Sequence, residues 1–179
     1  NKSKTMKKTY TLILLFFLLC MTSVIAQDYG NEIMKINNYV VKTYSHTKEL
    51  SNNIKPYEQA LGVKGLSFKQ ITPDDPQTDD TQNWITLGDY NSPNFSMITV
   101  NEGEWVSGYS INDSKFQISI GNRIFKIGDS WKETYYKLNL GIKFTMPKEY
   151  IKVFYNDAIL TIGFMYYEIS YFHFENTSY

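Results

Sequence analysis

Residues 130–141 read SWKETYYKLNLG, and this stretch predicts a helix with a defined start and a defined end. Ser130 and Glu133 have the spacing of a capping box, in which a serine oxygen and a glutamate carboxylate bind the free amides at a helix start. The helix is expected to run to Leu140 and to stop at Gly141, because glycine readily adopts the left-handed conformation that ends many helices. The rest of the sequence can be arranged around this predicted helix.

Runs of β-branched and aromatic residues, separated by turn residues, predict strands on both sides of this helix. The predicted strands cover residues 84–87, 95–100, 105–111, 116–120, 150–155, 159–164 and 167–174. Asn101-Glu102-Gly103 predicts a hairpin turn between the second and third of these strands. Residues 72–80 combine two prolines with four acids, which predicts a solvated loop.

Two further helices are expected in the first part of the chain. Apolar residues recur at three- and four-residue steps from Ile33 to Thr47, which predicts a long helix over residues 31–53. Pro56 and Gly62 bracket a short helix over residues 56–61. Helices combined with antiparallel strands predict an α+β fold class.

The spacing of a few residues indicates a tandem repeat. Ser51 and Leu61-Gly62 are matched 79 residues later by Ser130 and Leu140-Gly141, and Val106 and Tyr109 are matched 63 residues later by Ile169 and Phe172. On this interpretation each unit is a helix followed by an antiparallel meander, one over residues 27–112 and one over 113–179. A chance match, or one continuous domain, is the alternative.

The second of these units resembles a known kind of module. The features that carry the resemblance are the Gly128-Asp129-Ser130 turn, the Leu140-Gly141 helix end and the closing strands through Phe174. They resemble the helix-plus-sheet modules of beta-lactamase-inhibitory proteins, of small outer-membrane assembly lipoproteins and of related bacterial secreted domains. The resemblance implies a fold and no activity by itself. The chain departs from the inhibitory proteins because its mature part has no cysteine for a disulfide.

Residues 1–26 have the pattern of a secretory signal peptide. They combine a basic start at Lys7-Lys8, an apolar run over residues 12–21 and a cleavable Val24-Ile25-Ala26 site. Cleavage after Ala26 would release the protein into the periplasm or the exterior, and the segment resembles signal peptides of Gram-negative bacteria. An uncleaved anchor and a lipoprotein modified at Cys20 are the alternatives.

The composition of the mature part, from Gln27 onward, narrows the classes of function. It carries 14 basic and 18 acidic side chains and no cysteine. We expect no nucleic-acid binding, because affinity for phosphates depends on an excess of Lys and Arg. Without cysteine the mature chain has no disulfide, thiolate metal site or cysteine nucleophile. We also expect no membrane association once the signal has been removed.

The sequence offers few groups for catalysis or for metal binding. His46 and His173 lie in no nucleophile motif, and apart from Glu49, an ordinary helical neighbour of His46, neither has a histidine or an acid at the spacing of a metal site. The four acids of residues 72–80 lack the ligand pattern of an EF-hand. We therefore expect no enzyme activity, cofactor or metal, and we keep a hydrolase built on either histidine only as a third alternative.

Large aromatic side chains are concentrated near the end of the chain, where they fall on both faces of the predicted strands. Tyrosine is common at interfaces because a wide apolar ring carries a polar group at small entropic cost. The candidate interface residues are Tyr166, Tyr167, Tyr171 and Phe172. We therefore expect a non-catalytic protein-binding module with an unknown protein partner. The alternatives are core filler, or a cone-shaped α+β domain whose aromatics line a pocket for a small apolar ligand.

The signal peptide gives a first testable prediction. The exported protein should begin at Gln27, because the apolar run of the first 26 residues is too short to cross the roughly 30 Å of hydrocarbon in a bilayer. Intact-mass analysis of the exported protein checks this. A mass that still includes Cys20, with or without a lipid, would contradict the prediction.

Overall fold

The computed structural model describes residues 28–43, 53–72, 81–89, 91–100, 105–141 and 147–177. The predicted signal peptide, His46, the turn at residues 101–103 and residues 73–80 of the acidic loop lie outside these ranges. None of the helices in the described ranges is long and apolar enough to cross a membrane.

The described residues form two antiparallel sheets. The larger sheet has seven strands in the order β3-β4-β5-β6-β11-β10-β9, and the smaller sheet has four in the order β2-β1-β7-β8. The strands of the larger sheet are β3 (Ser67–Ile71), β4 (Gln82–Asp89), β5 (Ser92–Val100), β6 (Trp105–Ile111), β9 (Tyr150–Tyr155), β10 (Ala158–Met165) and β11 (Glu168–Asn176). Those of the smaller sheet are β1 (Met34–Ile36), β2 (Tyr39–Val40), β7 (Gln117–Ile120) and β8 (Arg123–Lys126).

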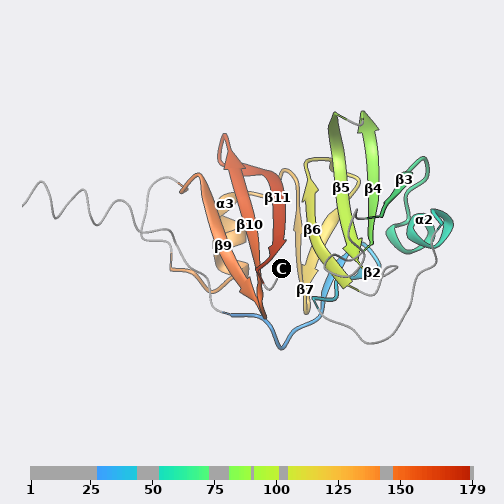
Figure 1. Cartoon of the computed structure of the whole chain (residues 1–179). Helices are drawn as coiled ribbons and strands as arrows, with labels where there is room; N and C mark the ends of the chain where they lie inside the picture. The colour runs from blue at the N-terminus through green and yellow to red at the C-terminus, as the bar shows by residue number, and fades with distance from the viewer. Residues whose placement is uncertain are drawn as a thin grey trace, which may run out of the picture.

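The core lies between one face of the larger sheet and the smaller sheet with α3 (Trp131–Lys137), which lie behind the larger sheet in Figure 1. Tyr109 of β6 stacks on Phe174 of β11 with ring centroids 4.8 Å apart, and its hydroxyl donates to Met34 Sδ of β1 at 3.3 Å. Burial holds the pKa of Tyr109 well above its usual range, so this hydroxyl stays protonated and remains a donor. The two sheets are thus joined at the centre of the larger one.

The two helices begin and end with identifiable residues. α2 (Lys55–Leu61) ends at Gly62, whose φ of 67° is left-handed, so this short helix is confirmed. α3 begins at Ser130, whose side chain accepts from the Glu133 N–H at 3.3 Å. The Glu133 carboxylate pairs with Lys137 at 2.7 Å. The predicted cap is therefore confirmed on the serine side.

The end of α3 differs from the prediction. The helix ends at Lys137, and the left-handed residue that follows is Asn139, with a φ of 54°. The Asn139 N–H donates to Tyr136 O at 3.0 Å and the Leu140 N–H donates to Tyr135 O at 2.8 Å, which is the pattern of a Schellman motif. The predicted stop at Gly141 is wrong because asparagine can also adopt this conformation.

The predicted long helix over residues 31–53 is also wrong. Its described part contains the hairpin of β1 and β2, and Asn37 in the turn has a φ of 52°. The Asn37 side chain donates to Leu61 O at 2.6 Å and accepts from the Gln117 N–H at 2.9 Å. These bonds hold the turn against α2 and β7, which are distant in the sequence. The spacing of apolar residues within residues 31–53 contains no information about such contacts.

The predicted fold class must be corrected as well. Eleven strands and two helices of seven residues each make up the regular structure of the described ranges, so the fold is mostly β and is not an α+β arrangement of helix-plus-meander modules. β6 and β11 were matched as equivalent strands of two units, but they are hydrogen-bonded neighbours in one sheet, with Phe174 opposite Tyr109. Neighbouring strands share one buried face, which gives them similar sequence patterns.

The left-handed residue at the end of α3 gives a second prediction. Asn139→Val should lower the free energy of unfolding by about 1–2 kcal/mol, because a β-branched residue is strained at positive φ. Asn139→Gly is the matched control and should be at least as stable as the parent. Urea unfolding midpoints of the two variants provide the measurement. Equal stability of the valine variant and the parent would contradict this account of the helix end.

Candidate functional site

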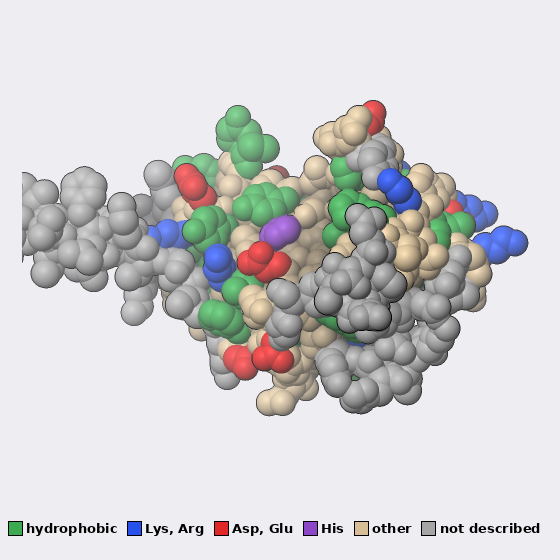
Figure 2. Space-filling view, in the orientation of Figure 1, with side chains coloured by type: hydrophobic (Ala, Val, Ile, Leu, Met, Phe, Trp, Pro, Cys, Tyr) green, Lys and Arg blue, Asp and Glu red, His purple; other side chains and the backbone are tan. Residues whose placement is uncertain are grey.

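The turn between β10 and β11, at one end of the larger sheet, carries two exposed tyrosines. Met165 and Glu168 are paired, so Tyr166 and Tyr167 form a two-residue hairpin loop. Their exposed fractions are 87% and 53%, and that of Met165 is 59%. We call residues 165–168 the tyrosine turn. Figure 2 shows hydrophobic side chains gathered over this side of the larger sheet and at its tip.

The backbone of the tyrosine turn is unusual for the residues that form it. Tyr166 and Tyr167 have φ values of 52° and 73°. A two-residue turn with both φ values positive normally has Asn-Gly or a similar pair, because a bulky residue in this conformation costs about 1–2 kcal/mol. The other non-glycine residues with positive φ in the described ranges are Asn37, Asn139 and Asn156. The chain therefore uses asparagine at these left-handed positions and tyrosine at the exposed tip.

Backbone hydrogen bonds to the start of α3 hold the tyrosine turn in place. The Trp131 N–H donates to Tyr167 O at 2.9 Å, and the Ile169 N–H donates to Asp129 O at 2.9 Å. Ser130 and Glu168 form a β-bridge between these two bonds. The turn is thus supported by rigid backbone on one side while its side chains remain in solvent.

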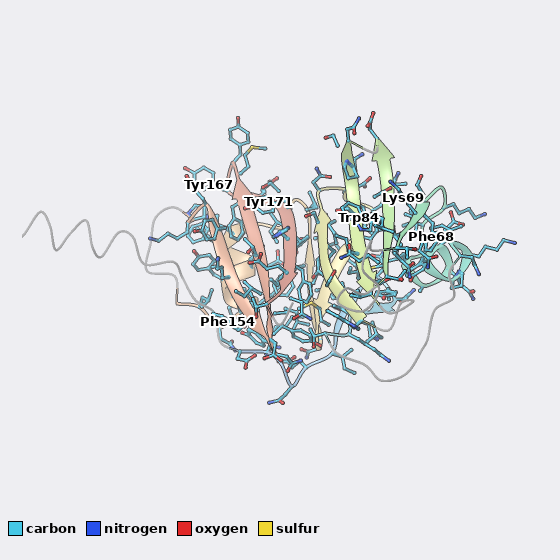
Figure 3. All side chains as sticks on the ribbon, in the orientation of Figure 1. Phe68, Lys69, Trp84, Phe154, Tyr167 and Tyr171 are labelled. Carbon is cyan, nitrogen blue, oxygen red and sulfur yellow. The ribbon has the colours of Figure 1, made fainter. Side chains whose placement is uncertain are left out.

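Tyr171 extends the exposed aromatic surface along β11. Its exposed fraction is 39%, and it is paired with Gly163 of β10, which in turn is paired with Tyr150 of β9. The Tyr171 ring lies so close over Gly163 that a Cβ at this position would overlap with the ring. Glycine is required here because a larger residue would occupy the space of the ring. Figure 3 shows Tyr167 and Tyr171 on the same side of the molecule.

The structure separates the four candidate interface residues into two groups. Tyr166, Tyr167 and Tyr171 lie on the exposed side, whereas Phe172 has an exposed fraction of 0% and belongs to the core. Tyr171 and Phe172 are adjacent in β11 and therefore point to opposite faces. Phe172 is paired with Ile111, which is also buried. The aromatic residues occur on both faces because one face is core and the other is open.

Ser110, His173 and Glu175 lie near one another on the open face, although no sequence motif links these three residues. Ser110 Oγ and His173 Nδ1 are 2.9 Å apart, and His173 Nε2 is 4.0 Å from Glu175 Oε2. The second distance is too long for the hydrogen bond by which a triad acid orients its histidine. The His173 and Glu175 side chains are about half exposed. This geometry binds polar groups more readily than it activates a nucleophile.

Two further features of the described residues are the placement of metal-ligating side chains and the packing between the sheets. No three His, Cys, Asp or Glu residues of the described ranges lie together in a way that could hold a metal ion. The space between the sheets is filled with stacked rings such as Phe95 and Phe116, whose centroids are 4.2 Å apart.

A groove of about 510 Å³ lies elsewhere, between β8 and α3. It contains Arg123 and Lys137, but both cations have partners: Arg123 Nη1 is 2.6 Å from Glu32 Oε1, and Lys137 Nζ is 2.7 Å from Glu133 Oε1. Partial burial lowers the pKa of Lys137, but hydrogen bonds and charge from Glu133 and Asp129 outweigh this effect and raise it. The paired cations are therefore poorly suited to bind an anion.

Comparisons with known proteins add no identification. No protein-family model, no curated protein and no solved structure matches this chain. The resemblance to inhibitory and outer-membrane assembly modules stays a prediction from the sequence.

The strain in the tyrosine turn gives a third prediction. Replacing Tyr166-Tyr167 by Asn-Gly should raise the free energy of unfolding by about 1–2 kcal/mol, because these residues adopt positive φ at a lower cost. Tyr136→Asn is the control, since Tyr136 is an 80% exposed tyrosine on α3 and asparagine should bring no gain there. Urea unfolding midpoints decide between the outcomes. A lower midpoint for the Asn-Gly variant would show that the two rings stabilise the fold.

Proposed function

We propose that this protein is an exported, non-catalytic binding protein that presents the tyrosine turn to a protein partner in the bacterial envelope or outside the cell. The observation that carries the proposal is the pair of positive φ values at Tyr166 and Tyr167, two bulky residues at the most exposed point of the β10–β11 hairpin. The location in the envelope or outside the cell is inferred from the signal peptide expected at residues 1–26.

The positive φ values of Tyr166 and Tyr167 lower the stability of the folded chain. Strained backbone persists where the surrounding structure holds it, and it is often found at functional sites. Tyr166 is 87% exposed, so its ring buries little surface that would offset the strain. A partner that covers the ring would bury this surface and supply the missing free energy.

The chemistry of the turn suits a protein partner. Tyrosine is a frequent anchor at protein interfaces, and its ring loses little conformational freedom on binding. The hydrogen bonds from Trp131 N–H to Tyr167 O and from Ile169 N–H to Asp129 O hold the backbone before any partner arrives. Preorganisation of this kind lowers the entropic cost of association. Met165, next to the two rings, adds an apolar side chain that adapts to different shapes.

Site-specific crosslinking in the producing cells tests the proposal and gives a fourth prediction. A photoreactive phenylalanine analogue at position 166 should crosslink the protein to one defined partner, because the side chain would be buried in the interface. The same analogue at position 136 is the matched control, since Tyr136 is also highly exposed, at 80%, and lines the groove between β8 and α3. A partner band at position 166 and none at position 136 is the expected result, read by gel electrophoresis and mass spectrometry.

The Asn-Gly variant of the turn then separates binding from folding. With the crosslinker moved to position 171, this variant should lose the partner band although it is at least as stable as the parent. Truncation of a central aromatic anchor commonly weakens binding by about 2 kcal/mol or more, which is roughly thirtyfold in Kd. An unchanged partner band in the Asn-Gly variant, or equal crosslinking at positions 166 and 136, would contradict the proposed function.

A further inference from the structure

A second pocket lies on the open face of the larger sheet, between β6 and β11, and has a volume of about 280 Å³. We call it the sheet pocket. Its walls are the side chains of Pro93, Ser110, Asn112, Tyr171 and His173. Ile111 and Phe172 contribute backbone to its floor, because their side chains are buried on the opposite face.

The sequence of the neighbouring strands explains why the sheet is hollow at this point. β6 has small residues on its open face, Gly108 and Ser110, and these leave space above the strand. On the other side, the Tyr171 ring packs against Gly163 of β10, where a Cβ would overlap with it. Of these residues, Ser110 and Tyr171 line the pocket itself.

The groups around the sheet pocket are neutral and polar, with one aromatic ring. Asn112 offers an amide, Ser110 and Tyr171 offer hydroxyls, and His173 offers ring nitrogens. Ser110 Oγ and His173 Nδ1 bind each other at 2.9 Å, which orients the imidazole, and the His173 side chain is about half exposed. The Glu175 carboxylate lies 4.0 Å from His173 Nε2.

We propose that the sheet pocket binds one ring of a neutral sugar, with the C–H face of the ring on Tyr171 and its hydroxyls bound by Asn112, Ser110 and His173. An anionic ligand would meet the Glu175 carboxylate and no unpaired cation among the lining residues. A wholly apolar ligand would bury the amide and hydroxyl groups without partners, which is costly. A sugar ring fits both kinds of group in the pocket, because its hydroxyls can bind the polar side chains and its C–H face can pack on the aromatic ring.

This inference goes beyond the proposed function, because it concerns a different ligand and different residues. The tyrosine turn is formed by residues 165–168, whereas the sheet pocket is lined mainly from β6, the residue after it and the middle of β11. Tyr171 is the point at which the two surfaces meet. The volume is slightly below the range of about 300–1,000 Å³ typical of pockets for drug-sized molecules, which suits a single ring of a longer chain.

Nuclear magnetic resonance titration tests the sugar site and gives the fifth prediction. Neutral di- and trisaccharides of glucose, galactose, mannose and N-acetylglucosamine are added to the labelled protein up to roughly 10 mM, which detects even weak sites. We expect at least one of them to shift the amide signals of β6 and β11 at residues 110–112 and 171–173. Asn112→Ala should weaken this binding about tenfold, as expected for one lost hydrogen bond.

Controls make the test specific. Asn122→Ala changes an asparagine of the other groove and should leave sugar binding unchanged. Tyr171→Phe should retain most of the affinity, whereas Tyr171→Ser should remove it, because the ring face provides the contact. Since the sugar is neutral, the Kd should be nearly the same in low and high salt.

Several results would overturn the sugar site. These are the absence of shifts at β6 and β11 with every saccharide, equal loss of binding in Asn112→Ala and Asn122→Ala, or binding of acidic sugars alone. The two proposals fail separately. The Asn-Gly variant of the tyrosine turn should still bind the sugar, and Asn112→Ala should still crosslink to the partner through position 166.

Discussion

The contact between β6 and β1 is the interaction on which the rest of the structure depends. Tyr109 connects the centre of the larger sheet to the smaller one through its hydroxyl and Met34 Sδ, and it stacks on Phe174 in the adjacent β11. Because the smaller sheet and α3 pack on this side, one face of the larger sheet is buried. The opposite face, with Tyr171, His173 and Glu175, is exposed to solvent.

The same arrangement explains how strain can be kept at the β10–β11 tip. The start of α3 is held near Tyr167 and Ile169 by backbone hydrogen bonds, so relaxation of the turn would break them. Tyr166 and Tyr167 then remain in a conformation that asparagine and glycine adopt at a lower cost. Under the proposed function, the strained turn lowers the stability of the free protein and presents the two rings to a partner, a trade-off that is common at functional sites. The sheet pocket involves no such trade-off, because small residues create it.

Part of this fold could be predicted from local patterns. The strand predictions over residues 105–111 and 150–155 agree with β6 and β9, and the Ser130 cap and the Gly62 helix end were also found. β1, β2, β3 and β8 were missed, because strands of two to five residues give little periodicity and are held by distant partners. These omissions are the reason that a mostly β fold was taken for an α+β one.

The sequence by itself determined the neutral-to-acidic composition, the positions of the longer strands and the local signals that begin and end the helices. It also determined that aromatic residues near the C-terminus are too numerous for one face of a strand. Only the tertiary structure decided that Phe172 is core and Tyr171 is open, because this depends on which face the smaller sheet covers. It also decided that Ser110 meets His173, since a strand pairing across 63 residues is set by packing and register, which no local pattern contains.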